Sequence, residues 1–197
     1  MGALVAVLFG LLAGVSYGSA PILSKRAYTA GMSPIHVSLA STVIATIALL
    51  TVNAFLYPPS ELLSVFSITG VFIFVCGGVV GSGAGRLLSF TGIDRLGASV
   101  NTAIIGIYPV IATAFAFIML AESITGTEIA ITGVIVISLS DGGDVSGWTY
   151  TDLLYPVTGA TAYGAAAVIR RYGFVETPLT TIQATTLNEI AAMVVLL

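Results

Sequence analysis

Residues Tyr17–Pro34 read YGSAPILSKRAYTAGMSP, and a related pattern returns near the other end of the chain, where Tyr163–Pro178 read YGAAAVIRRYGFVETP. Aligning the two stretches pairs their Tyr-Gly steps, the cations Lys25 and Arg171, and the Ser-Pro and Thr-Pro steps that close them. An apolar run precedes each copy, and another follows its proline. Because a repeat spaced about 145 residues apart is too long for a solenoid period, the pattern predicts two related halves of one architecture.

The composition around this repeat is that of a membrane protein. Hydrophobic residues make up 57% of the chain and charged residues only 8%, with a mean hydropathy of +1.07. Soluble domains carry about a quarter charged residues, so the expected partner is the lipid bilayer. Six cations without a basic stripe argue against nucleic acid. Cys76 is the single cysteine, which leaves no disulfide within the chain and no cysteine-based metal site.

Apolar segments of nearly membrane-spanning length recur along the whole chain. A helix needs about 20 mostly apolar residues to cross the hydrocarbon core. Seven segments approach that length, namely Ala3–Leu23, Pro34–Leu56, Ser67–Phe90, Ala98–Leu120, Glu128–Leu139, Leu153–Ile169 and Pro178–Leu197. The fifth is the weakest, so six spans is the alternative. Short links rich in glycine, proline and serine separate them. The sequence predicts an all-α polytopic membrane helix bundle of about seven transmembrane helices.

Glycines at a spacing of four occur in the first and third segments. They are Gly10, Gly14 and Gly18, and Gly77, Gly81 and Gly85. This spacing places each set along one helix face, where two backbones can approach closely. We expect close helix packing at both sets. The alternative is a mobile seam between helices that rock against each other.

The central part of the chain resembles a known family. Residues Gly81–Gly143, which begin GSGAGRLLSFTGIDRLG, resemble the second part of the repeat in EamA-type permeases of the drug/metabolite transporter superfamily. The matching positions are Gly85, Ala98, Pro109, Glu122 and Gly133. The Tyr-Gly, Lys and Ser-Pro pattern resembles the start of the same repeat. The resemblance therefore covers nearly the whole chain.

This resemblance implies a secondary carrier. EamA-type permeases have ten spans in two five-helix repeats of opposite orientation, and move small metabolites by alternating access with both termini in the cytoplasm. It implies a plasma-membrane protein with a small-molecule substrate, a first repeat at residues 1–143 and the start of a second at 144–197. Cations follow both the first and the sixth segment, so the charge bias does not decide the orientation, and the resemblance favours an N-terminus in the cytoplasm. Nothing in the sequence calls for a cofactor, and homo-oligomers stay an open alternative.

The family pattern also predicts three further helices after residue 197. We expect a truncated coding sequence, so that the chain is an incomplete transporter. The alternative is a non-transporting integral membrane protein, or a partial product that needs a partner or the missing helices.

Two departures from the family pattern concern charge. The family often has an arginine seven residues after the proline, where this chain has Ser41 and, in the second copy, Thr185. An acidic residue common before the mid-span proline is replaced by Tyr108. The loss of a cation and an anion indicates a different substrate, or a pair removed together.

Ionisable residues inside the apolar segments are candidates for the substrate pathway, because charges at membrane depth usually face a cavity or a partner. Arg86 could meet an anionic group on the substrate, and its alternative is snorkelling to the interface. Glu189, near the middle of the last segment, could couple protons or contact substrate. Its alternatives are a structural hydrogen bond and pairing with Arg86.

Several other polar and aromatic residues are weaker candidates for the same pathway. Interface anchoring or packing is the alternative for each tyrosine. These candidates are Tyr17, Lys25, Asn101, Tyr108 and Tyr163.

Enzymatic and metal-binding readings find little support. Residues 14–18 fit the G-x-S-x-G pattern of serine hydrolases, but they lie in an apolar helical run and not at a strand-to-helix turn. His36 has no nearby ligand cluster, so no metal site is expected. A seven-span retinal protein would need a lysine in its last span, and Lys25 is the only lysine. We therefore expect no catalytic residues.

Overall fold

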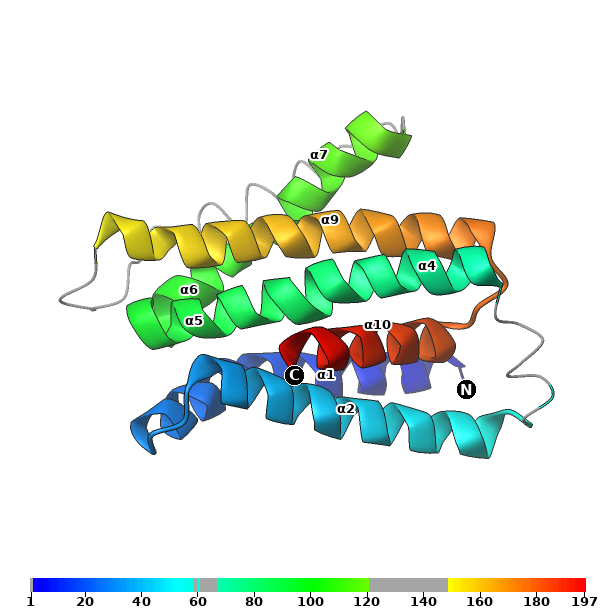
Figure 1. The fold of residues 1–197 in the computed structure, drawn as a ribbon, viewed down its shortest axis with the longest axis horizontal. Coiled ribbons are helices and arrows are strands. Elements are labelled where there is room, and N and C mark those ends of the chain that lie inside the picture. The colour runs from blue at the N-terminus through cyan, green and yellow to red at the C-terminus, as the bar shows by residue number, and fades with distance from the viewer. Residues whose placement is uncertain (1, 59, 61–66, 121–148) are drawn as a thin grey trace.

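The computed structural model describes residues 2–58, 60, 67–120 and 149–197, and all regular structure in these ranges is helical. The all-α prediction is confirmed. Four helices are longer than the other single elements and are labelled in Figure 1. They are α1 (Gly2–Thr29), α2 (Pro34–Leu56), α9 (Leu154–Glu176) and α10 (Thr181–Leu196). A short 3-10 turn, η2 (Tyr150–Leu153), leads into α9.

The central element is one continuous helical rod over Ile68–Leu96. It consists of α4 (Ile68–Gly77), a π-helical segment η1 (Gly78–Gly85) and α5 (Arg86–Leu96). Figure 1 shows α9 along one side of the rod, and α10 with α2 along the other. This rod carries Arg86, whose side chain makes the hydrogen bonds of the site described below.

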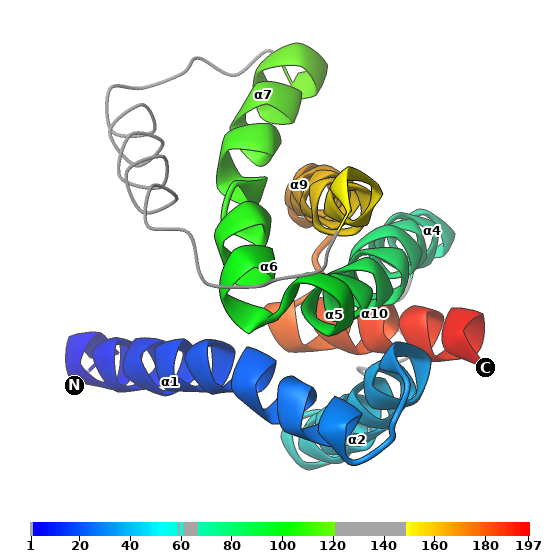
Figure 2. The same cartoon turned by 90° about the vertical axis from the view of Figure 1, so that its left-hand side faces the viewer.

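A second apolar stretch is bent in its middle. Helix α6 (Ala98–Ile105) is followed by α7 (Tyr108–Leu120), and α7 packs against α9 (Figure 2). Pro109 has no N–H to donate to the carbonyl of Ile105, so the α-helical hydrogen-bond ladder cannot run unbroken through residues 105–109. Gly97, at a φ of 86°, makes the turn between α5 and α6.

Four of the seven expected spans are found, with changed boundaries. Four described helices are long and apolar enough to cross a membrane, at Val5–Thr29, Pro34–Leu56, Ile68–Leu96 and Ala98–Leu120. The first and third therefore extend six residues beyond the expected ends. The sixth segment forms α9, whose second half carries Arg170 and Arg171, and the seventh forms the shorter apolar helix α10.

Several expectations concern residues outside the described ranges. They are the fifth span at Glu128–Leu139, the family positions Glu122 and Gly133, and the boundary between the two repeats after Gly143.

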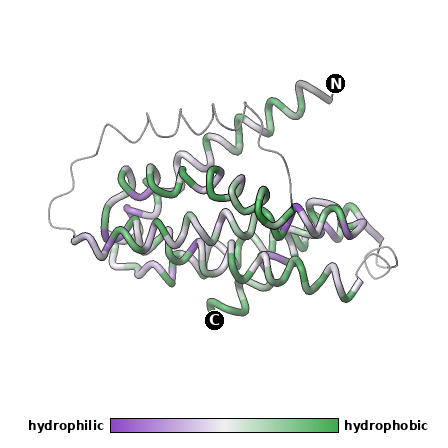
Figure 3. The backbone as a smooth tube through the Cα atoms, turned by 90° about the horizontal axis from the view of Figure 1, so that it is seen from above, coloured by the Kyte–Doolittle hydropathy of each residue, from purple (hydrophilic) through white to green (hydrophobic). Residues whose placement is uncertain are grey.

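Burial on α2 is inverted relative to a helix of a water-soluble protein. On α2 the buried side chains are polar, and Ser38 and Thr42 have no exposed surface at all. The outer face of the same helix is apolar, with Ile44 69% and Phe55 86% exposed. Figure 3 shows hydrophobic residues along helices throughout the molecule. Large exposed apolar faces suit a hydrocarbon solvent, which supports an integral membrane protein.

Close helix packing occurs at the second glycine set. A Cβ on Gly81 would lie 2.6 Å from the Cβ of Ala166 on α9, and a Cβ on Gly85 would lie 3.3 Å from the ring of Tyr163. Gly77 and its neighbour Gly78 face Asn188 on α10. The rod therefore contacts α9 and α10 through glycines on its surface, as small residues allow in membranes.

The first glycine set does not show the expected packing among the described residues. A Cβ on Gly10, Gly14 or Gly18 would meet no described atom within 4 Å. Figure 2 shows the reason: α1 meets α2, α5 and α6 near its C-terminal end, while its N-terminal half extends away from them. Equal spacing in the sequence thus corresponds to two different environments.

This difference gives a matched pair of glycine substitutions. We expect Gly81→Ala to lower the free energy of unfolding by about 1–3 kcal/mol, because the added methyl group overlaps Ala166. Gly14→Ala should leave stability unchanged or slightly raised. Thermal unfolding of both variants in detergent measures the difference, and equal unfolding temperatures would contradict the close contact at Gly81.

Candidate functional site

Arg86 and Glu189 form a two-point ion pair between the central rod and α10. Arg86 Nη2 donates to Glu189 Oε1 and Nη1 donates to Oε2, each at 2.7 Å. Nη1 also donates to Thr42 Oγ1 on α2 at 2.7 Å. One guanidinium therefore joins three helices that lie far apart in the sequence.

The pair is largely removed from solvent. The Glu189 side chain is 6% exposed and that of Arg86 is 21% exposed. Parallel N–H···O bonds from a planar guanidinium to a carboxylate are among the strongest and most directional side-chain interactions. At membrane depth each charge alone would be costly, so each is held by the other. Of the alternatives for Glu189, pairing with Arg86 is the geometry that the structure contains.

The position of Arg86 depends on the π-helical segment before it. The backbone N–H of Arg86 donates to the carbonyl of Gly81, five residues back. Such i→i+5 segments are rare and widen the helix locally, and they are frequent at functional sites. Four of the eight residues from Gly78 to Gly85 are glycine, which keeps this irregular segment free of side-chain clashes.

Glu189 is brought to the rod by the close crossing of α10. A Cβ on Gly78 would lie 2.6 Å from the Cα of Asn188, so only glycine allows the two backbones to meet there. The start of α10 is fixed by Thr180 and Gln183, whose side chains cap the helix reciprocally. The buried face of α10 then presents Glu189 toward Arg86.

The repeated pattern aligns two tyrosines, Tyr17 on α1 and Tyr163 on α9. Tyr163 on α9 packs its ring against Gly85, next to Arg86, and meets the ring of Tyr108 edge to face with centroids 6.2 Å apart. Tyr17 on α1 is 83% exposed. The structure therefore groups Tyr108 and Tyr163 beside Gly85, at one end of η1, and leaves Tyr17 exposed on α1.

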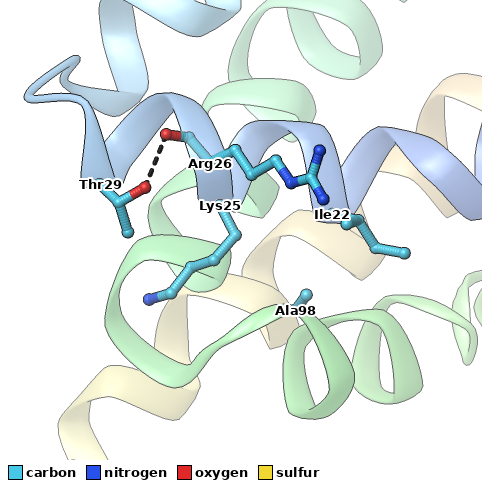
Figure 4. A pocket seen from close by; sticks show the side chains of 5 residues that line it. All are labelled: Ile22, Lys25, Arg26, Thr29 and Ala98. Carbon is cyan, nitrogen blue, oxygen red and sulfur yellow. Dashed lines mark hydrogen bonds between the residues drawn. The ribbon is translucent and has the colours of Figure 1, made fainter.

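Lys25 lies away from this group. Together with Ile22, Arg26, Thr29 and Ala98 it lines a shallow hollow between α1 and the start of α6 (Figure 4). The Lys25 side chain is exposed, and Thr29 Oγ1 donates to the Arg26 carbonyl at 2.8 Å. The structure therefore does not bring Lys25 to the Arg86–Glu189 pair.

Asn101 is buried at a helix contact. It is 1% exposed, its Nδ2 donates to Ser89 Oγ at 3.3 Å, and its side chain packs on Gly92 of α5. This contact closes the turn between α5 and α6. Asn101 is placed here as a packing residue, separate from the ion pair.

A second ion pair at the end of the rod serves as a comparison. Arg95 Nη1 lies 3.7 Å from Asp152 Oδ1, and the Arg95 side chain is 56% exposed. The backbone N–H and hydroxyl of Thr149 bind the Asp152 carboxylate and hold its pKa below the ordinary value. At neutral pH this pair is charged, but its N···O distance is longer and its arginine is more exposed than in the Arg86–Glu189 pair.

Ser16 and His36, which were considered above for a hydrolase site and a metal site, make ordinary local contacts. Ser16 of the G-x-S-x-G pattern donates its hydroxyl to the carbonyl of Leu12 within α1, as serines in membrane helices do. His36 Nδ1 lies 2.7 Å from Ser33 Oγ at the start of α2. Among the described residues no group of three potential metal ligands is present.

The sequence reasoning missed one part of the site, the polar face of α2. Its buried side chains recur at intervals of four and seven residues, at Ser38, Thr42, Thr46 and Asn53. The helical spacing of polar residues in an otherwise apolar span was the available signal. Thr42 belongs to the site because it accepts a hydrogen bond from Arg86.

We expect substitutions of Arg86 and Glu189 to have strongly coupled effects on the free energy of unfolding. Glu189→Leu leaves the guanidinium, and Arg86→Met leaves the carboxylate, without its counter-ion, and each single change should lower the free energy of unfolding by about 3–5 kcal/mol. Arg86→Met combined with Glu189→Leu should lose less than either single change, because no unpaired charge remains. Thermal unfolding in detergent of the two single variants and the double variant measures this coupling. Simple addition of the two single effects would show that the pair contributes no interaction energy.

Comparison with known proteins assigns the chain to a family. The family model described as "EamA-like transporter family" matches residues 4–140. Comparison with curated proteins gave no match. The matched residues include α1, α2, the central rod and α6 to α7, and they make up more than half of the 197 residues. The chain therefore belongs to the EamA-like transporter family.

Proposed function

We propose that this protein is a secondary carrier that moves small polar or amphipathic metabolites across the cell membrane by alternating access. Membership of the EamA-like family supports a membrane transporter of the drug/metabolite type. The observation that carries the proposal further is the buried Arg86–Glu189 pair, together with its bond to Thr42. Charges inside an apolar span mark substrate or proton pathways more often than they mark simple packing.

The pair provides a binding element for a charged group. A guanidinium that can bind two oxygens of a carboxylate can also bind an anionic group of a substrate in the same geometry. In this proposal the substrate competes with Glu189 for Arg86, and loss of the internal pair loosens the contact of α10 with α2 and the rod. Binding is then linked to a change in helix packing, as alternating access requires.

Protonation supplies a second way to release the same contact. A neutral carboxylic acid no longer attracts the guanidinium as a carboxylate does, so a proton on Glu189 weakens its bond to Arg86. We propose that proton binding and substrate binding act on this one pair. The two aromatic rings of Tyr108 and Tyr163 beside η1 would form an apolar wall of the pathway.

The first experiment identifies a ligand. Purified protein in detergent is screened by thermal shift against amino acids, nucleosides and organic anions. We expect one class to raise the unfolding temperature of the wild-type protein, because a ligand that binds only the folded state stabilises it by mass action. Arg86→Gln should remove this shift, and a shift that persists in Arg86→Gln would contradict a role of Arg86 in binding.

The second experiment tests coupling through Glu189. With the ligand so identified, Glu189→Gln should reduce proton-dependent flux into proteoliposomes by about tenfold or more, since the amide cannot carry the proton. Glu176→Gln, at the exposed end of α9, is the matched control and should keep the wild-type rate. Unchanged proton-dependent flux in Glu189→Gln would rule out coupling through this residue.

A further inference from the structure

The polar face of α2 continues beyond the ion pair along the contact with α10. We call this contact the α2–α10 seam and define it by Thr42, Thr46 and Asn53 on α2 and Thr186 and Glu189 on α10. All five side chains are buried, with exposures of 0%, 2%, 5%, 6% and 5%. The two helices run in opposite directions, because Asn53 meets Thr186 while Thr42 lies at the level of Glu189 through Arg86.

One end of the seam reaches the surface. Tyr57 OH donates to Thr180 Oγ1 at 3.0 Å, and this bond is exposed. The next contact inward is Asn53 Nδ2 to Thr186 Oγ1 at 2.7 Å, which is buried. Thr46 follows two helical turns further along α2, and Glu189 follows one turn further along α10. The polar groups therefore form a line from an exposed edge to the buried carboxylate.

Two oxygen atoms along this line have no hydrogen-bond partner among the described residues. They are Thr46 Oγ1 and Asn53 Oδ1. Other threonines in these two helices donate to the carbonyl four residues back, as Thr42, Thr51 and Thr186 do. Thr46 does not make this bond, so its hydroxyl is available to another partner. A buried polar group without a partner costs roughly 1–3 kcal/mol, and lipid chains can supply no hydrogen bond.

The neighbouring residues on α2 show that this polarity is specific to the seam. Ile44 and Ile47 are 69% and 61% exposed on the outer face of the helix. Thr46 stands between them in sequence but is 2% exposed. A helix that turns its apolar side outward and its hydroxyls inward is arranged around a polar occupant and not around a dry core.

We propose that water enters the α2–α10 seam from the edge at Tyr57 and Thr180 and reaches Glu189 past Asn53 and Thr46. Water is small enough for a closed helix contact and can both donate to and accept from these side chains. The inference rests on the proposed function in giving Glu189 a role, and it adds the route by which a proton or a small polar ligand arrives there. The route follows α2 and α10, and the glycine-lined side of the rod is not part of it.

Cysteine accessibility tests the route directly. A thiol reacts with a water-soluble maleimide as the thiolate, which forms only where water reaches it. In a Cys76→Ser background, Thr46→Cys places a thiol in the seam at nearly unchanged volume. Ile47→Cys, one residue further on, is the matched control on the outer face. Labelling is measured on the protein in sealed membrane vesicles, with the reagent added to each side.

We expect Thr46→Cys to be labelled at least about tenfold faster than Ile47→Cys, and fastest from the side that carries Tyr57. If Thr46→Cys lowers the unfolding temperature, Asn53→Cys repeats the measurement closer to the edge. A rate for the seam cysteines equal to or below that of Ile47→Cys would overturn the water route.

The labelling does not depend on transport, so the two proposals can fail separately. Fast labelling of Thr46→Cys in a protein without flux would support the water route and contradict the carrier. Proton-dependent flux without labelling at Thr46 or Asn53 would support the carrier and overturn the route along this seam.

Discussion

Buried charges and polar groups must find hydrogen-bond partners within this chain, because its outer surface faces hydrocarbon. The structure depends on this constraint. Arg86 and Glu189 meet this need with two parallel hydrogen bonds, and Thr42 adds a third. Because lipid cannot replace water as a hydrogen-bond partner, the helices that carry these groups must lie together. The ion pair therefore fixes the relative positions of α2, α10 and the central rod, in addition to the binding role proposed for it.

The same constraint explains the two unlike sides of the rod. Toward α9 the contacts are made by glycines and small side chains, such as Gly81 against Ala166 and Gly85 against Tyr163. Toward α2 and α10 the contacts combine the Arg86 hydrogen bonds with the close approach of Gly78 to Asn188. Dispersion between closely packed backbones favours a fixed arrangement, whereas hydrogen bonds between side chains can be exchanged for bonds to water or a ligand.

The sequence was sufficient for the fold class and for the two main charged residues. Arg86 and Glu189 stand out because charges are rare in apolar spans, and their pairing was one of the alternatives. The sequence could not show that Gly10, Gly14 and Gly18 lack described neighbours while Gly77, Gly81 and Gly85 have close ones, since spacing fixes a helix face but not what lies against it.

The π-helical geometry of Gly78–Gly85 was likewise beyond the sequence reasoning. Hydrophobic periodicity cannot separate an i→i+5 segment from an α-helix over only eight residues. The polar stripe on α2 could have been found, because hydroxyls at Ser38, Thr42 and Thr46 repeat every four residues. It was overlooked because serine and threonine in membrane helices usually bond their own backbone, which makes them poor markers of a site.

Gly78 has a consequence for how variation at this site should be interpreted. This residue has no charge and no side chain, and this lack of a side chain sets the distance between α10 and the rod at Asn188, one position before Glu189. Any larger residue there displaces a carboxylate that it never touches. A natural variant at Gly78 could thus disable Glu189 while every ionisable group in the protein remains intact. A survey limited to charged positions would then not reveal the cause.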